Sequence, residues 1–408
     1  MKRHLLILPF LILTAGCTVP EVIKVDFDDF TVTEVKTSAL FFEDGSLNPE
    51  VRLMEDPNLP EEVPTKVART DAATIVRNML DQVNSNRIIQ YAGVFSGHDV
   101  DGVTPLRQSG KLLIPEKGPI KNLVLVSHFT IGANDEAPSM CFPMEGILAA
   151  KGYAVAIADY IGYGATADRI HPYMHTRSTS QSVVDMALAV KPFLDHLGRT
   201  LESEEVILVG YSQGGSTTMA VMKMLQEERS DVFPIKEVYA GGGPYDLAAT
   251  FDFSMAEDKT GIPCAIPMIV QGINDGEGLG LNMEDFFKGN LLKNYKEWIN
   301  SKKYSVAEIN KLIGSRYLHD IMTDLGRDKS SPETARLYKA LLKNSVLNFR
   351  PESPVYLFHS REDQTVPFIN AVQAENYFKL NDIRFNFGDY GQHAIGCLRF
   401  IILVYNML

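Results

Sequence analysis

The pentapeptide Gly210-Tyr211-Ser212-Gln213-Gly214 constrains the fold of this chain more than any other feature. A short apolar run precedes it and a helix-like segment follows it, so a strand, a tight turn and a helix are predicted. Glycines flank the serine because strand and helix approach too closely there for side chains. This geometry exposes a serine oxygen beside the first backbone N–H groups of a helix. A glycine-rich turn with a solvated serine is the alternative, and the strand before and helix after favour a nucleophile.

An acid and a histidine follow Ser212 in the chain order that such a site needs. A strand-like run ends near His359, and the loop after it carries Glu362 and Asp363. We prefer Asp363 as the functional carboxylate, with Glu362 as its competitor and simple solvation of both as a third interpretation. The next strand-like run is followed by His393, in a glycine-flanked loop before the final helix. His359 lies inside its strand and is assigned to the core.

These three residue types together supply nucleophilic catalysis. A serine hydroxyl is a poor nucleophile at neutral pH, so His393 would remove the Ser212 proton during attack and return it to the leaving group. Asp363 would hold the imidazole tautomer and stabilise the imidazolium.

The developing oxyanion needs two hydrogen-bond donors. One is the backbone N–H of Gln213, the residue after the nucleophile. The second is expected in the loop after the strand-like run at residues 122–127, and we assign it to the backbone of Thr130, with Phe129 as the alternative.

These residues resemble the α/β-hydrolase superfamily and, within it, the secretory lipase family of serine esterases. Residues 99–104, 109–115, 127–130, 159–164 and 242–247 carry the closer likeness, which covers roughly residues 88 to 400. The resemblance implies an α/β fold with a doubly wound, mostly parallel sheet. Phe129 departs from the family, which usually has glycine there, so the oxyanion loop is expected to have a different shape.

The pattern of elements divides the chain into five parts. An alternation of strands and helices predicts a mostly parallel sheet, and an all-helical stretch interrupts it between the sixth and seventh strands. In the superfamily such an insertion forms a cap over the serine, and a peripheral helical decoration is the alternative. The predicted parts are a signal peptide (1–16), an N-terminal tether with a helix over 71–84 (17–87), the first part of the core (88–247), the helical cap (248–348) and the second part of the core (349–408).

The N-terminus predicts export. Lys2 and Arg3 precede a nine-residue apolar segment from Leu5 to Leu13, which is too short to span a bilayer stably. Small residues then lead to Cys17, in a pattern that resembles a bacterial lipoprotein box, so Cys17 is the predicted lipidation site and membrane anchor. An ordinary cleaved leader with an incidental cysteine is the alternative.

Composition excludes several other functions. A net charge of −12 with no basic patch argues against nucleic-acid binding. His171 and His175 have an i,i+4 spacing, but Pro172 and the lack of a nearby glutamate argue against a zinc site. No metal or cofactor is therefore predicted, and the sequence gives no signal for oligomeric state.

The sequence thus predicts an exported, envelope-anchored or secreted serine hydrolase that cleaves small-molecule or lipid carboxylic esters through an acyl-enzyme. A serine peptidase of the same fold is the runner-up, and a carbohydrate deacetylase or feruloyl-type esterase is a further alternative. The Ser, Asp and His together argue against a non-catalytic binding protein. An apolar cap predicts that butyryl esters are preferred over acetyl esters.

Overall fold

The structure is a computed structural model. It describes residues 21–37, 42–43, 46–47, 51–52, 54 and 87–408, apart from residues 231, 380 and 382. The predicted signal peptide, Cys17 and the helix expected over 71–84 therefore lie outside the described residues. No helix in the described part is long and apolar enough to cross a membrane.

A ten-stranded sheet forms the centre of the molecule, with strand order β14-β13-β12-β11-β8-β10-β7-β6-β1-β2. Neighbouring strands are parallel except at the pairs β10/β7, β6/β7 and β1/β2, which confirms the prediction of a mostly parallel sheet. The strands are β1 (Glu21–Asp26), β2 (Val32–Thr37), β3 (Phe42–Glu43), β4 (Ser46–Leu47), β5 (Val51–Arg52), β6 (Ile88–His98), β7 (Pro105–Pro115), β8 (Leu123–Ser127), β9 (Phe142–Pro143), β10 (Ala154–Ala158), β11 (Val206–Tyr211), β12 (Ile235–Gly241), β13 (Val355–Ser360) and β14 (Ile383–Gly388).

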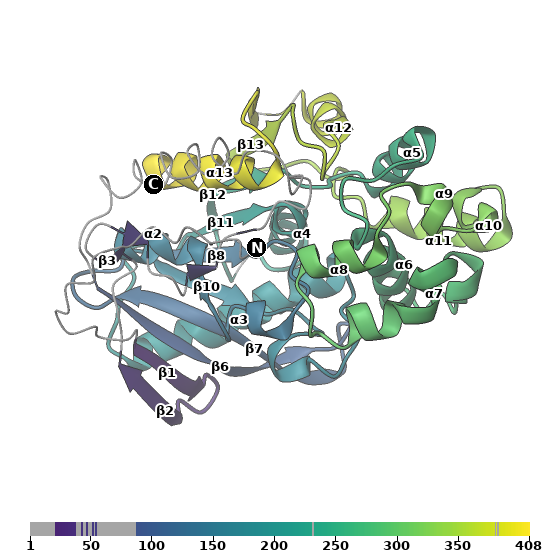
Figure 1. Cartoon of the computed structure of the whole chain (residues 1–408). Coiled ribbons are helices and arrows are strands. Elements are labelled where there is room, and N and C mark those ends of the chain that lie inside the picture. Colours follow the sequence, from purple (N-terminus) through teal and green to yellow (C-terminus); the bar gives the residue numbers. More distant parts are fainter. Residues whose placement is uncertain are drawn as a thin grey trace, which may run out of the picture.

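Helices cover both faces of this sheet (Figure 1). The helices and short helical turns are η1 (Asn134–Glu136), η2 (Met144–Gly146), α2 (Ile147–Ala150), η3 (Gly164–Thr166), α3 (Thr176–His196), α4 (Gln213–Glu228), α5 (Leu247–Glu257), α6 (Ala265–Gly276), η4 (Met283–Asp285), α7 (Gly289–Tyr295), η5 (Lys296–Asn300), α8 (Val306–Ile313), α9 (Leu318–Ile321), α10 (Asp324–Arg327), α11 (Pro332–Lys343), α12 (Ile369–Phe378) and α13 (His393–Met407). One buried apolar cluster joins α3, α4 and α12 to the sheet, and a second joins α2 and α13 to it. The central strands β8, β10 and β11 are buried along their whole length, which explains why they are continuous apolar runs rather than alternating ones.

The start of the chain differs from the tether that we predicted. Residues 21–37 form β1 and β2, and β1 pairs in parallel with β6, with Ile23 opposite Tyr91. Val25 and Phe27 are buried in the core, where Phe27 meets the Phe193 ring edge-on at 5.2 Å between centroids. The acidic, proline-containing segments further along dominated the sequence pattern of this part, so β1 and the edge strand β2 were missed.

A helical block from α5 to α11 separates β12 from β13 and gathers to one side of the sheet (Figure 1). It has a hydrophobic cluster of its own, which also takes in Tyr173 and Met174 from the segment before α3. Ser305 and Glu308 form a capping box at the start of α8. Gly314 adopts a left-handed conformation (φ 75°) that ends α8, and two shorter helices follow.

Candidate active site

Ser212 is the single residue between β11 and α4, at the apex of the predicted strand–turn–helix. Its backbone has φ 60° and ψ −125°, a conformation that non-glycine residues rarely adopt and that costs about 1–3 kcal/mol. The Ser212 N–H donates to the Gly241 carbonyl at 2.9 Å, which ties the turn to the neighbouring strand β12. The strained turn is thus held in place by the sheet.

The glycines on either side of Ser212 are required by close approach. A Cβ atom added at Gly214 would lie 1.9 Å from the Ser127 carbonyl oxygen, and one at Gly210 would lie 2.3 Å from the Gly214 carbonyl oxygen. Any larger residue would force α4 away from β8 and β11. The first turn of α4 therefore sits directly against the end of β8, where the loop with Phe129 and Thr130 begins.

The structure brings Ser212, His393 and Asp363 together from three separate parts of the chain. His393 Nε2 lies 2.8 Å from Ser212 Oγ, and His393 Nδ1 lies 2.5 Å from Asp363 Oδ2. The carboxylate can only accept, so Nδ1 donates to Asp363 and Nε2 is left to accept the serine proton. His393 is the first residue of α13 rather than a loop residue.

The sheet explains why the acid and the histidine meet. Strands β13 and β14 are parallel, with Ser360 opposite Gly388, and the Arg361 N–H donates to the Gly388 carbonyl at 2.8 Å. The loops after the two strands therefore start side by side. Tyr211, the elbow residue before the nucleophile, donates from its hydroxyl to the His393 carbonyl at 3.0 Å and holds the start of α13.

The two neighbouring acids of the loop after β13 have different surroundings. Asp363 is buried, and its Oδ1 accepts from the backbone N–H groups of Thr365 at 2.8 Å and Val366 at 2.9 Å. Glu362 is exposed and accepts from the Gly391 N–H at 2.7 Å. Glu362 thus braces the loop before His393, whereas Asp363 contacts the imidazole itself.

The electrostatics of this group favour an ionised Asp363. Burial alone would raise the pKa of the Asp363 carboxyl, but His393, by charge and hydrogen bond, and the backbone donor of Val366 lower that pKa below its usual value. His359 lies near the same carboxylate, at 3.8 Å from Nε2 to Asp363 Oδ2, and donates to the Val366 carbonyl at 3.1 Å. Burial lowers the pKa of His359, so its imidazole stays neutral beside Asp363.

The predicted oxyanion residues gather at the start of α4. Strand β8 is parallel to β11 with Ser127 opposite Gly210, so residues 128–130 leave the sheet beside the turn. Gln213 is the first residue of α4, and a helix provides no partner for its first N–H groups. Thr130 is buried and its Oγ1 lies 2.7 Å from the Tyr173 hydroxyl oxygen. The choice between the Thr130 and Phe129 backbone as second donor stays a prediction.

Two supporting residues were missed from the sequence. His171 Nε2 lies 3.0 Å from Gln213 Nε2, and His171 Nδ1 lies 2.7 Å from the Ile161 carbonyl oxygen. Burial lowers the pKa of His171 well below its usual range, so the neutral ring donates to Ile161 and accepts from the Gln213 amide. Tyr173 is the second supporting residue, because its hydroxyl shares a hydrogen bond with Thr130 Oγ1. The sequence analysis considered His171 only as half of a possible metal-binding pair with His175, which it rejected, and it gave no signal for this supporting role.

We found no group of three histidine, cysteine or carboxylate residues in the described part of the chain that could hold a metal ion. The ring of His175 is directed to Ser178 Oγ at 2.9 Å and to Glu277 Oε1 at 3.6 Å, away from the interactions of His171.

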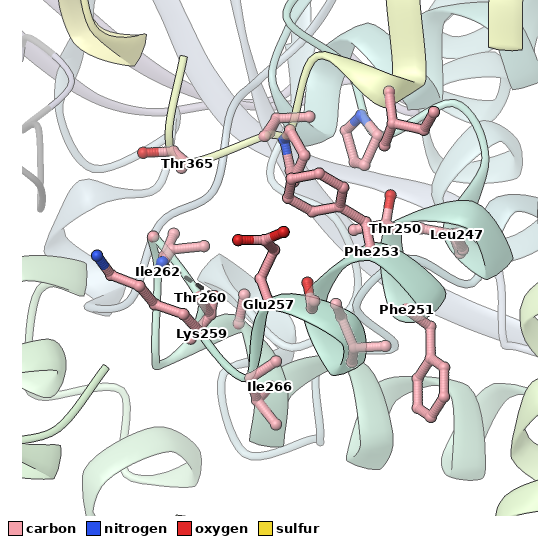
Figure 2. A pocket seen from close by; sticks show the side chains of 18 of the residues that line it. Leu247, Thr250, Phe251, Phe253, Glu257, Lys259, Thr260, Ile262, Ile266 and Thr365 are labelled. Carbon is pink, nitrogen blue, oxygen red and sulfur yellow. Dashed lines mark hydrogen bonds between the residues drawn. The ribbon is translucent and has the colours of Figure 1, made fainter. Parts of the chain in front are cut away.

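The helical block contacts the loops around Ser212. The Asn134 N–H, just beyond the oxyanion loop, donates to the Lys302 carbonyl at 2.8 Å. An apolar cavity of about 430 Å³ lies between α5, α6 and the loop after β13, and both Asp363 and Tyr173 line it. Figure 2 shows Thr365 of the core on one side, and Glu257, Lys259 and Ile262 of the block on the other. The cavity is thus bounded by the acid loop and by the residue that holds Thr130.

Comparison with known proteins identifies the family of this chain. Residues 143–389, more than half of the chain, match the family model of the secretory lipases. The chain therefore belongs to the secretory lipase family, which makes it an ester hydrolase and confirms the resemblance seen in the sequence. No curated protein sequence matches the chain significantly.

Several solved structures share the fold. A ligand-bound form of the rice cell wall degrading esterase LipA from Xanthomonas oryzae is 23% identical, with a TM-score of 0.69 over 82% of this chain and 94% of LipA. A Legionella pneumophila protein described as a hydrolase is 21% identical, with a TM-score of 0.73 over 83% and 93%. Candida antarctica lipase A in its closed state is 17% identical, with a TM-score of 0.55 over 78% and 75%. At these identities the likeness concerns the fold.

Proposed function

We propose that this protein is an exported serine hydrolase that cleaves carboxylic esters through a Ser212–His393–Asp363 triad. The observation that carries the proposal is the continuous hydrogen-bond path from Ser212 Oγ through both His393 nitrogens to Asp363, with distances of 2.8 and 2.5 Å. The strained turn at Ser212 supports it, because such strain persists where the surrounding structure enforces it, commonly at active sites.

The mechanism follows from the positions of these atoms. Ser212 Oγ attacks the acyl carbonyl while His393 Nε2 takes the hydroxyl proton, and the oxyanion forms beside the Gln213 N–H and a second donor from Thr130 or Phe129. His393 then gives the proton to the departing alcohol, which leaves an acyl group on Ser212. A water molecule then attacks the acyl carbonyl while His393 Nε2 takes a proton from it. His393 returns this proton to Ser212 Oγ, and the carboxylic acid is released. Asp363 keeps the proton on Nδ1 and stabilises the imidazolium formed in each step.

The helical block serves as the cap of this site in our proposal. Ser212 is only 4% exposed, and the block contacts the loop after β8 and shares a cavity with the acid loop. Leu247, Phe251 and Ile266 are among the side chains that line this cavity. A covered, mostly apolar cavity suits an ester with a hydrophobic acyl part and excludes water from the reaction.

The test combines a nucleophile variant with covalent labelling. Ser212→Ala should fold normally and lose hydrolysis of p-nitrophenyl butyrate by several orders of magnitude, and a fluorophosphonate should label Ser212 in the wild type, as seen by peptide mass spectrometry. Ser216→Ala, one helical turn further on, is the matched control and should stay within tenfold of wild type. Labelling of a different serine, or faster cleavage of a dipeptidyl amide than of the ester, would contradict the proposal.

We also propose that Cys17 anchors the exported protein to a membrane. The basic start, the apolar segment and the small residues before Cys17 support this proposal. The protein should incorporate labelled fatty acid and partition into detergent, and Cys17→Ser should do neither, whereas Thr18→Ala should behave as wild type. A free mature N-terminus at another residue would overturn the anchor without affecting the proposed chemistry.

A further inference from the structure

Lys302 is an unusual residue of the helical block, because it carries a charge in a buried position. It lies between η5 and α8 and is only 5% exposed. Its backbone has φ 56°, in the left-handed region that non-glycine residues rarely adopt, and such strain persists only where the surrounding structure enforces it. The Lys302 carbonyl accepts from the Asn134 N–H at 2.8 Å, so this segment is tied to η1. A charged side chain therefore lies at the contact between block and core.

The segment that carries Lys302 packs closely against the loop after β8. A Cβ atom added at Gly132 would lie 2.5 Å from the Tyr304 carbonyl oxygen, so no larger residue fits there without displacement. The Tyr163 hydroxyl donates to the Ile131 carbonyl of the same loop at 2.6 Å. The block thus contacts the direct continuation of the predicted oxyanion residues.

The Lys302 ammonium has no carboxylate partner. Within the part of the chain that the structure describes, Nζ makes no ion pair or hydrogen bond, and it lies 4.9 Å from the centroid of the Tyr163 ring. Removing a charge from water without an oppositely charged partner is costly, and an aromatic ring compensates only part of this cost. Burial accordingly lowers the pKa of Lys302 to about 8. The folded protein therefore holds an unbalanced positive charge at this contact.

The charged and titratable groups around Lys302 leave its charge in place. Of the two acids on η1, Asp135 is exposed, and Glu136 Oε2 accepts from two backbone N–H groups of its own loop at 3.0 and 2.9 Å. Burial raises the pKa of Tyr163 well above its ordinary value and lowers that of His171 well below it. Both of these groups are therefore neutral at pH 7, and Lys302 is the positive charge among them.

The charge of Lys302 acts on His171, which supports the predicted oxyanion site. The rings of Tyr163 and His171 lie 5.0 Å apart between centroids, and the Lys302 charge adds to burial in lowering the pKa of His171. His171 accepts from the Gln213 side chain at 3.0 Å, and the Gln213 N–H is the predicted oxyanion donor. A positive charge in such a buried environment stabilises the negative charge that develops on the substrate oxygen in the transition state.

We propose that Lys302 supports the oxyanion site electrostatically. Its ammonium favours the neutral form of His171, which holds the Gln213 side chain, and its positive charge stabilises the oxyanion beside the Gln213 N–H. Lys302 is a positioning residue, because it acts through His171 and Gln213. The block thereby contributes to the chemical step as well as to the cavity. This inference rests on the proposed ester hydrolysis.

The test removes the charge while keeping the size of the side chain. Lys302→Met should lower kcat for p-nitrophenyl butyrate at pH 7 by about tenfold, less than the loss of a direct oxyanion donor, and should change KM by less than about threefold. Lys302→Gln, a second uncharged variant, should show the same loss, whereas Lys302→Arg keeps the charge and should stay within about threefold of wild type. Lys303→Met is the matched control, because Lys303 is exposed and paired with Glu297 at 3.3 Å, and it should match wild type.

The pH dependence separates a role of the charge from a structural role. Wild type should lose activity as the pH rises through about 8, because Lys302 then loses its proton and with it the positive charge. Lys302→Met should lack this loss, and Lys302→Arg should keep its activity to higher pH, because arginine stays protonated. Ser212→Ala, measured in parallel, gives the spontaneous hydrolysis of the ester at each pH.

Stability provides a third readout. Lys302→Met should melt at or above the wild-type Tm, because it removes a buried charge that lacks a carboxylate partner, whereas a purely structural role would lower Tm and leave the pH profile unchanged. A wild-type kcat in both uncharged variants, or a wild-type pH profile in Lys302→Met, would overturn the inference and leave the esterase proposal intact. Absence of ester hydrolysis in wild type would overturn both together.

Discussion

The catalytic edge of the sheet and the helical block are built on different principles. At the sheet edge, Ser212 follows β11 directly, Asp363 lies in the loop after β13, and His393 begins α13 after β14. Parallel register brings the ends of β8, β11, β13 and β14 to the same edge. The block has a separate hydrophobic cluster and lines the apolar cavity beside Asp363. This difference suggests that the sheet supplies the reacting groups and that the block determines the ligand.

The largest expected effect tests the sheet edge. Asp363→Asn should lower kcat of ester hydrolysis by about 10³–10⁴, because an asparagine in this position favours the wrong imidazole tautomer. Glu362→Gln is the matched control and should change kcat by less than tenfold, because the Glu362 carboxylate accepts from the Gly391 backbone, whereas Asp363 contacts the imidazole itself. Steady-state kinetics with p-nitrophenyl butyrate measures both. A larger loss for Glu362→Gln than for Asp363→Asn would exchange the roles of the two acids.

A smaller effect tests the block. The apolar cavity beside Asp363 should raise kcat/KM from acetyl to butyryl esters by up to about fourfold for each added methylene, from a burial free energy of about 0.8 kcal/mol. Ile266→Trp should fill the cavity and remove this preference, while Leu312→Trp, exposed on α8 and outside the cavity, should retain it. A chain-length series of p-nitrophenyl esters gives the comparison. If wild type prefers acetate over every longer ester, this cavity does not bind the acyl chain.

The smallest expected effect concerns stability, at the contact between core and block. His175, just before α3, is buried against Glu277 of the block, with Lys343 and Arg177 nearby; burial lowers its pKa to about 4. As the pH falls, His175 is therefore protonated in the unfolded chain before it is protonated in the folded protein. The contribution of the buried neutral imidazole to the free energy of unfolding is complete above about pH 6.5 and is lost as the pH falls toward about 4. Between pH 7 and pH 5 we expect a loss of at most about 2 kcal/mol.

This pH dependence can be isolated with one variant. His175→Gln carries no titrating group, so urea unfolding at pH 7 and pH 5 should show a smaller loss of stability than in wild type. His196→Gln, on the last turn of α3, is the control and should retain the wild-type dependence. An identical pH dependence in His175→Gln and wild type would mean that His175 takes up no proton when the protein unfolds.

The sequence by itself determined the parts of this protein whose signals are local. The pentapeptide around Ser212 could be interpreted because a strand, a turn and a helix are contiguous in the chain, and the close contacts of Gly210 and Gly214 follow from that geometry. The alternation of strands and helices, which is also a local pattern along the chain, predicted the mostly parallel sheet. The chain order of serine, acid and histidine added Asp363 and His393, which follow recognisable strands.

Tertiary structure alone decided the features that depend on residues distant in the chain. Burial separates Asp363 from Glu362, adjacent residues that no periodicity distinguishes. The support of Gln213 by His171 and of Thr130 by Tyr173 depends on contacts more than forty residues apart. Gln271 is an ordinary polar residue of a helix in the sequence, and only packing shows that its amide is buried without a partner among the described residues. Sequence patterns report neighbours along the chain, whereas desolvation and hydrogen-bond pairing depend on neighbours in space.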